Sequence, residues 1–133
     1  MQATKTNENL LKAAQGEAMA RLKYTAFAQQ AMEERMPEIA QLFMEAAGAE
    51  TIHGITHLRA AGLVKSTLEN LRDAVEGEAD EVDTMYPKMI EEAKEEEAVN
   101  KEEAIKAFQV AIDREDDHER MFKAALESLE SKK

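Results

Sequence analysis

Apolar residues recur every three or four positions along this chain, in four long segments separated by short polar stretches. The spacing holds from Leu10 to Ala31, from Met36 to Ala60, from Leu71 to Met85 and from Ala104 to Leu129. A period near 3.6 is typical of helices that bury one face, here an apolar stripe on each helix. The four helices are predicted over residues 6–34, 37–61, 67–97 and 101–130.

Proline, glycine and capping residues mark the ends of these helices. Pro37 suits the first turn of the second helix, and Gly62 suits the left-handed position that ends it. Ser66 is a good N-cap for the third helix, Asn100 can cap the fourth, and Pro87 predicts a kink or local break within the third. Short connections favour antiparallel neighbours. The pattern therefore predicts an all-α fold, an antiparallel four-helix bundle.

Composition agrees with this fold and narrows the possible functions. The 133 residues suit a single domain (residues 1–133), with 44% apolar and only 5% aromatic residues. A net charge of -11 opposes binding to nucleic acid or to anionic membranes. No apolar run is long enough to span a bilayer and the N-terminus lacks an apolar signal core, so a cytoplasmic location is expected. The absence of cysteine excludes disulfides and thiolate metal sites.

The middle of each apolar stripe is charged rather than apolar. Carboxylates and imidazoles occupy the stripe near the midpoints of all four helices. They are Glu17, Glu50, His53, Glu78, Glu81, Glu115 and His118. Because the midpoints of antiparallel helices lie at one level of a bundle, we expect these side chains to converge on one spot.

Convergence of so many carboxylates predicts bound cations. A buried carboxylate costs several kcal/mol unless it is paired or ligated, and no Lys or Arg lies on the stripes at this level. Two divalent or trivalent ions would neutralise most of the charge. Oxygen-rich ligation with one imidazole for each ion suits iron or manganese, and zinc is an alternative.

The spacing of the ligands makes this prediction specific. Glu50 with His53, and Glu115 with His118, form two Glu-x-x-His units whose three-residue spacing places each pair on one helix face. One such unit is weak evidence in a Glu-rich helical chain. Two units with two further glutamates match the ligand set of di-metal four-helix bundles. A bundle whose polar faces are merely solvated is the competing interpretation.

With these motifs the sequence resembles rubrerythrin, in its ferritin-like di-iron domain. The resemblance covers about residues 8–127. It rests on four stretches: QGEAMARLKYTAFAQQA (15–31), IAQLFMEAAGAETIH (39–53), EGEADEVDTMYP (76–87) and EDDHERMF (115–122). It implies a ferritin-like antiparallel four-helix bundle that holds two iron ions, for which zinc or manganese can substitute.

The resemblance also implies a role for each metal ligand. Glu50 and Glu115 would bridge the two irons. Glu17 would be a terminal ligand on the first iron, and Glu78 with His118 would be terminal on the second.

Glu81 and His53 have linked roles in the same family pattern. The first iron would take Glu81 when oxidised and His53 when reduced, because a ferric ion favours a carboxylate and a ferrous ion tolerates a neutral imidazole. Tyr24 and Tyr86 would orient carboxylates by hydrogen bonds, with core packing as the alternative for each. His57, one turn beyond His53, is more simply a packing histidine, with a metal-proximal or proton-delivery role as its alternative.

The function that the resemblance implies is a non-haem di-iron peroxidase, an oxidoreductase that reduces hydrogen peroxide to water and protects against oxidative stress. Glu81, His53 and Tyr24 are its candidate catalytic residues, and the acid for the leaving oxygen is a metal-bound carboxylic acid, a water or Tyr24. Because the chain has no cysteine, electrons are expected from a separate donor such as a rubredoxin or another reductase. A homodimer is expected, and the short second connection allows pairs of helices to be exchanged between two chains.

Three other functions use the same residues. A ferroxidase or iron-storage protein would oxidise iron with oxygen, although Glu81 argues against storage. A non-catalytic bundle would use metal, including zinc, only to hold its helices together. An oxygen-activating hydroxylase would need a substrate pocket beside the metals, for which the sequence carries no signal.

Overall fold

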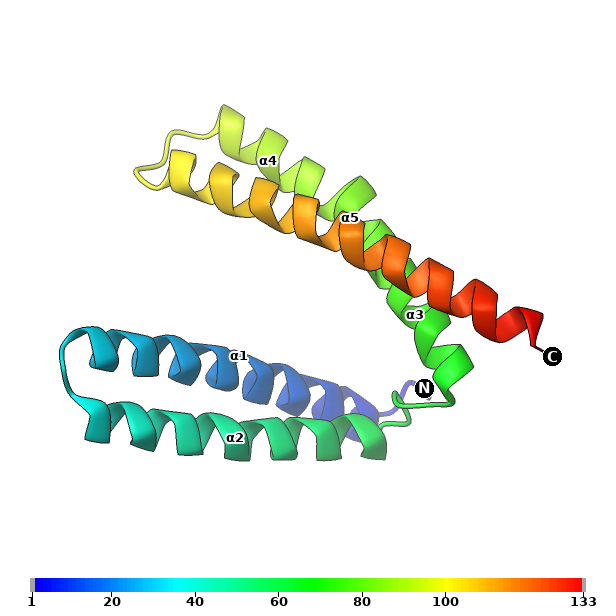
Figure 1. Cartoon of the computed structure of the whole chain (residues 1–133), viewed down its shortest axis with the longest axis horizontal. Helices are drawn as coiled ribbons and strands as arrows, with labels where there is room; N and C mark the ends of the chain where they lie inside the picture. Colours follow the sequence, from blue (N-terminus) through cyan, green and yellow to red (C-terminus); the bar gives the residue numbers. More distant parts are fainter. Residues whose placement is uncertain (1, 133) are drawn as a thin grey trace. The chain divides into compact units, whose positions relative to one another are not determined.

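The computed structural model describes residues 2–132, which form helices and no strand, as predicted (Figure 1). The elements are α1 (Lys5–Glu33), α2 (Pro37–Ala60), α3 (Thr67–Asp80), the π-helix η1 (Glu81–Met85), α4 (Tyr86–Glu95) and α5 (Lys101–Ser131). The chain forms two compact units, one ending at Val64 and the other beginning at Lys65. None of these helices is both long and apolar enough to cross a membrane.

The first unit is a hairpin in which α1 and α2 lie side by side and antiparallel (Figure 1). Its buried residues are small. They are Ala14, Ala28 and Ala31 of α1, Ala40 and Ala47 of α2, and Ala61. Alanine side chains let two helix backbones approach closely, because little volume separates them. The hairpin therefore has an alanine-lined contact, which holds α1 and α2 at a fixed register.

Both ends of α2 confirm the signals read from the sequence. Pro37 occupies the first turn of the helix. Gly62 has a φ of 75°, and the next amide, that of Leu63, donates to the carbonyl of Leu58 at 3.0 Å. This is the hydrogen bond of a Schellman C-cap, which needs a left-handed residue. Arg35 takes the same left-handed conformation after α1, with a φ of 62°, so α1 ends without a glycine.

In the second unit, α3, η1 and α4 follow one another and pack along α5 (Figure 1). Ser66 caps α3 as predicted, because its hydroxyl accepts a hydrogen bond from the amide of Glu69 at 3.2 Å. Asn100 lies at the predicted N-cap of α5, but its side chain makes no capping hydrogen bond among the described residues. The prediction is therefore right about the N-cap position and wrong about the capping hydrogen bond. The reason is the Asn100 backbone, whose φ of -96° and ψ of 15° lie outside the extended region that capping residues favour.

The break expected near Pro87 is confirmed, and it takes the form of the π-helix η1. The amide of Tyr86 donates to the carbonyl of Glu81, five residues back. Pro87 follows within the first turn of α4, where its missing N–H is tolerated. A π-helix of one turn accommodates one extra residue. The predicted third helix is thus two α-helices joined by a wide turn, and it ends at Glu95.

Candidate metal centre

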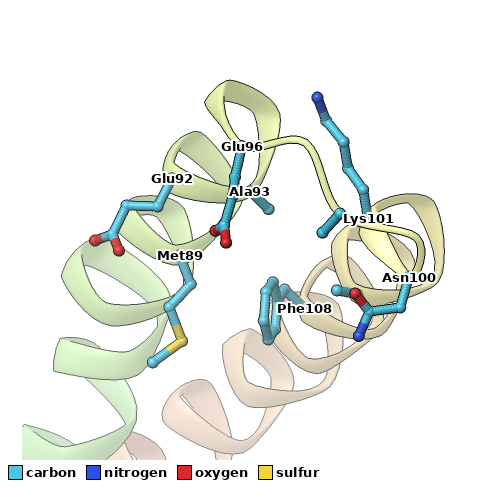
Figure 2. A pocket seen from close by; sticks show the side chains of 9 residues that line it. Met89, Glu92, Ala93, Glu96, Asn100, Lys101 and Phe108 are labelled. Carbon is cyan, nitrogen blue, oxygen red and sulfur yellow. The ribbon is translucent and has the colours of Figure 1, made fainter.

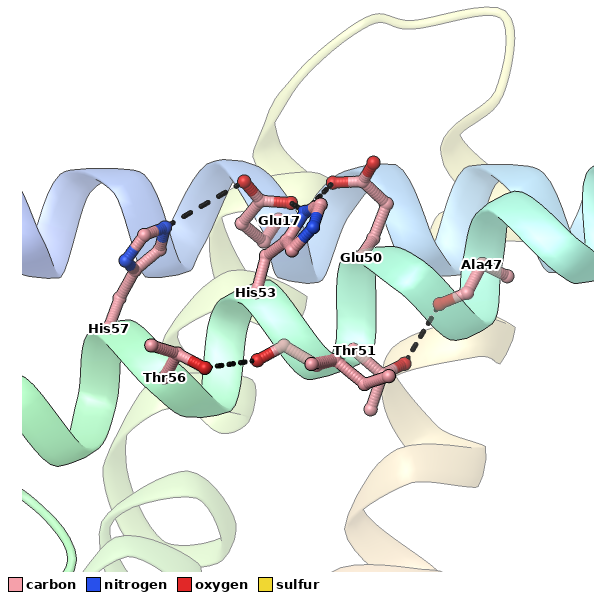
Figure 3. Close-up of polar contacts among 8 residues, drawn as sticks. Glu17, Ala47, Glu50, Thr51, His53, Thr56 and His57 are labelled. Atoms are coloured by element: carbon pink, nitrogen blue, oxygen red, sulfur yellow. Dashed lines mark hydrogen bonds and ion pairs between the residues drawn. The ribbon is translucent and has the colours of Figure 1, made fainter.

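The first cluster of metal-capable side chains lies on the facing sides of α1 and α2. Glu17, Glu50 and His53 each offer a ligand atom, and these atoms lie within 4.8 Å of one another. The Nδ1 atom of His53 is 3.6 Å from Oε2 of Glu17 and 3.9 Å from Oε2 of Glu50 (Figure 3). Gly54 of α2 lies directly opposite Glu17, since a Cβ atom built on Gly54 would be 3.4 Å from Cβ of Glu17.

The second cluster repeats the first one on α3 and α5. Ligand atoms of Glu78, Glu115 and His118 lie within 4.8 Å of one another. The Nδ1 atom of His118 is 3.8 Å from Oε1 of Glu115 and 3.9 Å from Oε2 of Glu78. Each cluster therefore combines a single glutamate from one helix with a Glu-x-x-His unit from an antiparallel neighbour, and the three-residue spacing places both side chains of each unit in the same cluster.

Glu81 joins the second cluster through Glu115. A side-chain hydrogen bond with Glu115 raises the pKa of Glu78 to about 7, with burial as the next cause. Burial first, and then a hydrogen bond with Glu115, raise the pKa of Glu81. The bond with Glu78 also lowers the pKa of Glu115. The three carboxyl groups are therefore close enough to shift one another's pKa values.

Two carboxylate oxygens test whether the clusters suit a metal. Oε2 of Glu17 and Oε2 of Glu78 are buried, and neither has a hydrogen-bond partner among the described residues. A buried unpaired acceptor is costly, so such atoms need an explanation. Each of these oxygens also faces Nδ1 of its cluster's histidine, at 3.6 Å for Glu17 and 3.9 Å for Glu78. A cation held between the carboxylates and the imidazole would satisfy both oxygens, so the residues fit one metal ion in each cluster.

The remaining sequence candidates lie at different distances from the clusters. Burial, and then the nearby charges of Glu81, Glu115 and Glu78 of the second cluster, raise the pKa of the Tyr86 hydroxyl. The ring of Tyr24 packs against Phe27 and Phe43, with ring centroids 6.3 Å and 6.2 Å away. Its role as an acid therefore stays a prediction.

The sequence left the role of His57 open, and the structure gives this residue a contact with the first cluster. Its Nε2 atom lies 3.9 Å from Oε1 of Glu17, on the edge of the first cluster (Figure 3). The four-residue spacing from His53 was a sequence signal for this proximity.

A separate pocket lies in the second unit, at the connection between α4 and α5 (Figure 2). It encloses about 340 Å³, with Met89 and Phe108 among its apolar residues and Glu92, Glu96 and Lys101 among its charged ones. Among the described residues it includes no histidine, and the unpartnered carboxylate oxygens lie elsewhere. The two clusters, and not this pocket, are therefore the candidate metal sites.

The raised pKa of Glu78 predicts how stability of the metal-free protein depends on pH. A folded-state pKa of about 7, above the ordinary 4.5, means that folding favours the neutral acid. That stabilisation is complete below 4.5 and is lost as pH rises through 7. The lowered pKa of Glu115 acts in the opposite sense, but only in more acidic solution. We expect the thermal midpoint in a chelator to fall by several degrees between about pH 5 and about pH 8.

Circular dichroism melts at the two pH values measure this change. Glu78→Gln is permanently neutral at this position and should show a clearly smaller fall. The exposed Glu76, two residues earlier in α3, provides the matched control, since Glu76→Gln should keep the full fall. A wild-type midpoint that is unchanged or higher at the more alkaline pH would contradict a raised pKa of Glu78.

Comparison with known proteins identifies the family. The rubrerythrin family model matches residues 8–126. A rubrerythrin of Porphyromonas gingivalis is 36% identical over an alignment that covers 98% of this chain and 70% of the relative. A rubrerythrin of Clostridium perfringens is 32% identical, covering 100% of this chain and 75% of the relative. Nigerythrin of Nitratidesulfovibrio vulgaris is 35% identical, covering 95% and 68%.

These matches agree with the helices and with the metal-capable clusters. The fold class is all-α and ferritin-like, as predicted. Proteins of the matched family typically bind iron in a di-iron centre and serve in oxidative stress, generally as oxidoreductases. On the strength of the family model and of these relatives, the chain belongs to the rubrerythrin family.

Proposed function

We propose that the two clusters together form one di-iron centre and that the protein reduces hydrogen peroxide to water. In this proposal, residues 1–133 make a single four-helix bundle, from one chain or by exchange of hairpins between two. The observation that carries it is the duplicated set of metal-capable side chains. Each cluster has one buried glutamate oxygen that finds no hydrogen-bond partner in the part of the chain that the structure describes. Family membership supports it, because rubrerythrins generally use peroxide and a redox partner.

The proposed ligand roles are those that the resemblance to rubrerythrin implies for these side chains. Glu50 and Glu115, from the two Glu-x-x-His units, would bridge the irons. Glu17 would be a terminal ligand in the first cluster, while Glu78 and His118 would be terminal ligands in the second. When bound, iron supplies the two electrons and the Lewis acidity that conversion of hydrogen peroxide and two protons into two waters requires.

In the cycle that the resemblance to rubrerythrin implies, Glu81 and His53 would be alternative ligands of the first iron. His53 lies against Glu17 and Glu50, and its side chain is 55% exposed in the unit. The Glu81 carboxyl group is hydrogen-bonded to Glu115. A neutral imidazole suits the reduced ion and a carboxylate suits the oxidised one. Because the raised pKa of Glu78 favours its neutral acid in the metal-free site, a cation must compete with a proton there, so metal affinity rises with pH.

Electrons for the cycle come from a redox centre outside these 133 residues. The sequence contains no cysteine, so it holds no thiolate-ligated iron. We propose a separate donor protein, such as a rubredoxin or another reductase. Tyr24 is kept as a candidate acid beside the carboxylic acids of the site, because it follows Glu17 by two helical turns.

We also propose that the protein is a homodimer. Three large apolar side chains of α1 and α2 lie outside the stripes that carry the metal ligands and are exposed. They are Leu22, Leu42 and Ile52, with exposed fractions between 62% and 67%. Large apolar side chains exposed outside the proposed core favour a further contact, and a second copy is the partner that is always present. Sedimentation equilibrium tests this proposal, which a monomer at all concentrations would contradict.

Stopped-flow oxidation tests the peroxidase proposal. The protein is loaded anaerobically with two ferrous ions per chain and mixed with hydrogen peroxide or, separately, with oxygen. Growth of the oxo-bridged diferric absorption reports oxidation, and zinc-loaded protein is the redox-inactive control. We expect peroxide to oxidise the site much faster than oxygen does. Faster oxidation by oxygen would favour a ferroxidase, while no reaction with either would favour a structural metal site.

A further inference from the structure

The two oxygens of Glu17 have different neighbours. Oε2 faces Nδ1 of His53 at 3.6 Å and is buried, with no hydrogen-bond partner in residues 2–132. Oε1 faces Nε2 of His57 at 3.9 Å (Figure 3). The carboxylate therefore lies between two imidazoles, with one oxygen turned to the metal-capable cluster and the other turned away from it.

His57 is placed to hold Glu17 rather than to be a ligand itself. The atoms that lie within 4.8 Å of one another belong to Glu17, Glu50 and His53. His57 is one turn further along α2, and its side chain is 31% exposed, compared with 55% for His53. Its contact with the cluster is through the outer oxygen of Glu17.

The second unit has no such histidine at the equivalent position. Four residues after His53 comes His57, whereas four residues after His118 comes Phe122. The Phe122 ring lies beside that of His118, with centroids 6.4 Å apart. Glu78, the counterpart of Glu17, instead shares a hydrogen bond with Glu115. The chain thus treats its two equivalent glutamates differently, and only the one in α1 has an imidazole at its outer oxygen.

We propose that His57 is a positioning residue for Glu17. Its Nε2–H donates to Oε1, which fixes the carboxylate so that Oε2 alone is offered to the metal of the first cluster. The present separation must shorten by about 1 Å to become a hydrogen bond. Groups that orient a ligand in this way typically change metal affinity by about 10- to 100-fold. The inference rests on the proposed function only in requiring that the cluster binds a metal.

Metal titration of three proteins tests this proposal. Wild type, His57→Phe and His57→Gln are stripped of metal and titrated with Co²⁺, and the visible absorption of bound cobalt is followed. His57→Phe copies the residue found in the second unit, while His57→Gln keeps an N–H donor. We expect His57→Phe to weaken one of the two equivalents by about tenfold or more, with His57→Gln within about threefold of wild type.

The cobalt spectrum gives a second readout that a purely structural role would not move. If Glu17 is released to bind through both oxygens, the coordination number rises and the absorption of the weakened equivalent becomes less intense. Circular dichroism of the metal-free variants checks that both fold. Wild-type affinity and spectrum in His57→Phe would overturn the proposal. So would equal losses in both variants, since that result would make the imidazole itself a ligand.

This test separates failure of the inference from failure of the proposed function. Cobalt binding does not depend on peroxide. One outcome is that the wild-type protein binds two cobalt ions and yet, when loaded with iron, leaves peroxide unreduced. That result would refute the peroxidase proposal without affecting the proposed role of His57. A wild-type protein that binds no cobalt would refute both.

Discussion

Replacing Glu81 with alanine is expected to slow oxidation of the diferrous protein by peroxide by at least about tenfold while two metal ions stay bound. Glu81 lies outside the two groups of three ligands that could each hold a metal. Its side chain instead reaches Glu115 from the first residue of η1. In the proposed cycle, Glu81 is needed for the oxidised state, so its loss raises the free energy of the product and not that of the reduced reactant.

The measurement combines metal analysis with stopped-flow oxidation. Glu81→Gln keeps the size of the side chain but removes the negative charge, so it should be nearly as slow as Glu81→Ala. Glu76→Ala removes an exposed carboxylate five residues earlier and should react at the wild-type rate. If Glu81→Ala were also oxidised at the wild-type rate, the idea that Glu81 replaces His53 during turnover would be wrong for this chain.

The helices and the two Glu-x-x-His pairs could be predicted because they depend on local spacing. Glu50 and His53, or Glu115 and His118, share a helix face whatever the rest of the chain does. The cap of α3 at Ser66 and the end of α2 at Gly62 are equally local, and both are confirmed. Where a prediction needed only the helical period, the structure agrees with it.

The π-helix could not be predicted in this way, although the spacing between glutamate and tyrosine differs by one residue between the two halves of the sequence. Tyr24 follows Glu17 by seven residues, while Tyr86 follows Glu78 by eight. Eight residues of regular α-helix would turn Tyr86 away from Glu78. Because η1 accommodates one extra residue, Tyr86 stays beside the carboxylates of its own cluster. Pro87 indicated a break, but not that the break would widen the helix.

The contact between His57 and Glu17 depends on the register of two helices. Sequence spacing places His57 on the ligand face of α2, but it does not say which residue of α1 lies opposite. That choice is made by the length of the turn through Arg35 and by the alanine-lined contact between α1 and α2. The same register turns the ring of Tyr24 toward Phe43.

Replacing His118 with alanine is expected to reduce the metal content from two ions per chain to about one. His118 is the only imidazole in the second cluster, and a hydrogen bond with Glu115 raises the pKa of its partner Glu78 to about 7. Without the imidazole, a metal must bind carboxylates alone and compete with protonation of Glu78, so the second ion is lost first. Metal analysis by mass spectrometry after dialysis measures the stoichiometry.

His53→Ala is the matched variant, because the two histidines occupy equivalent positions in the two clusters. Their loss should nevertheless have different effects. Glu81 can replace His53 in the oxidised protein, whereas no comparable substitute is proposed for His118. Diferric His53→Ala should therefore keep two ions while His118→Ala keeps one. Equal loss of both ions from His118→Ala would contradict its assignment as a terminal ligand, since a ligand of one metal should release that metal first.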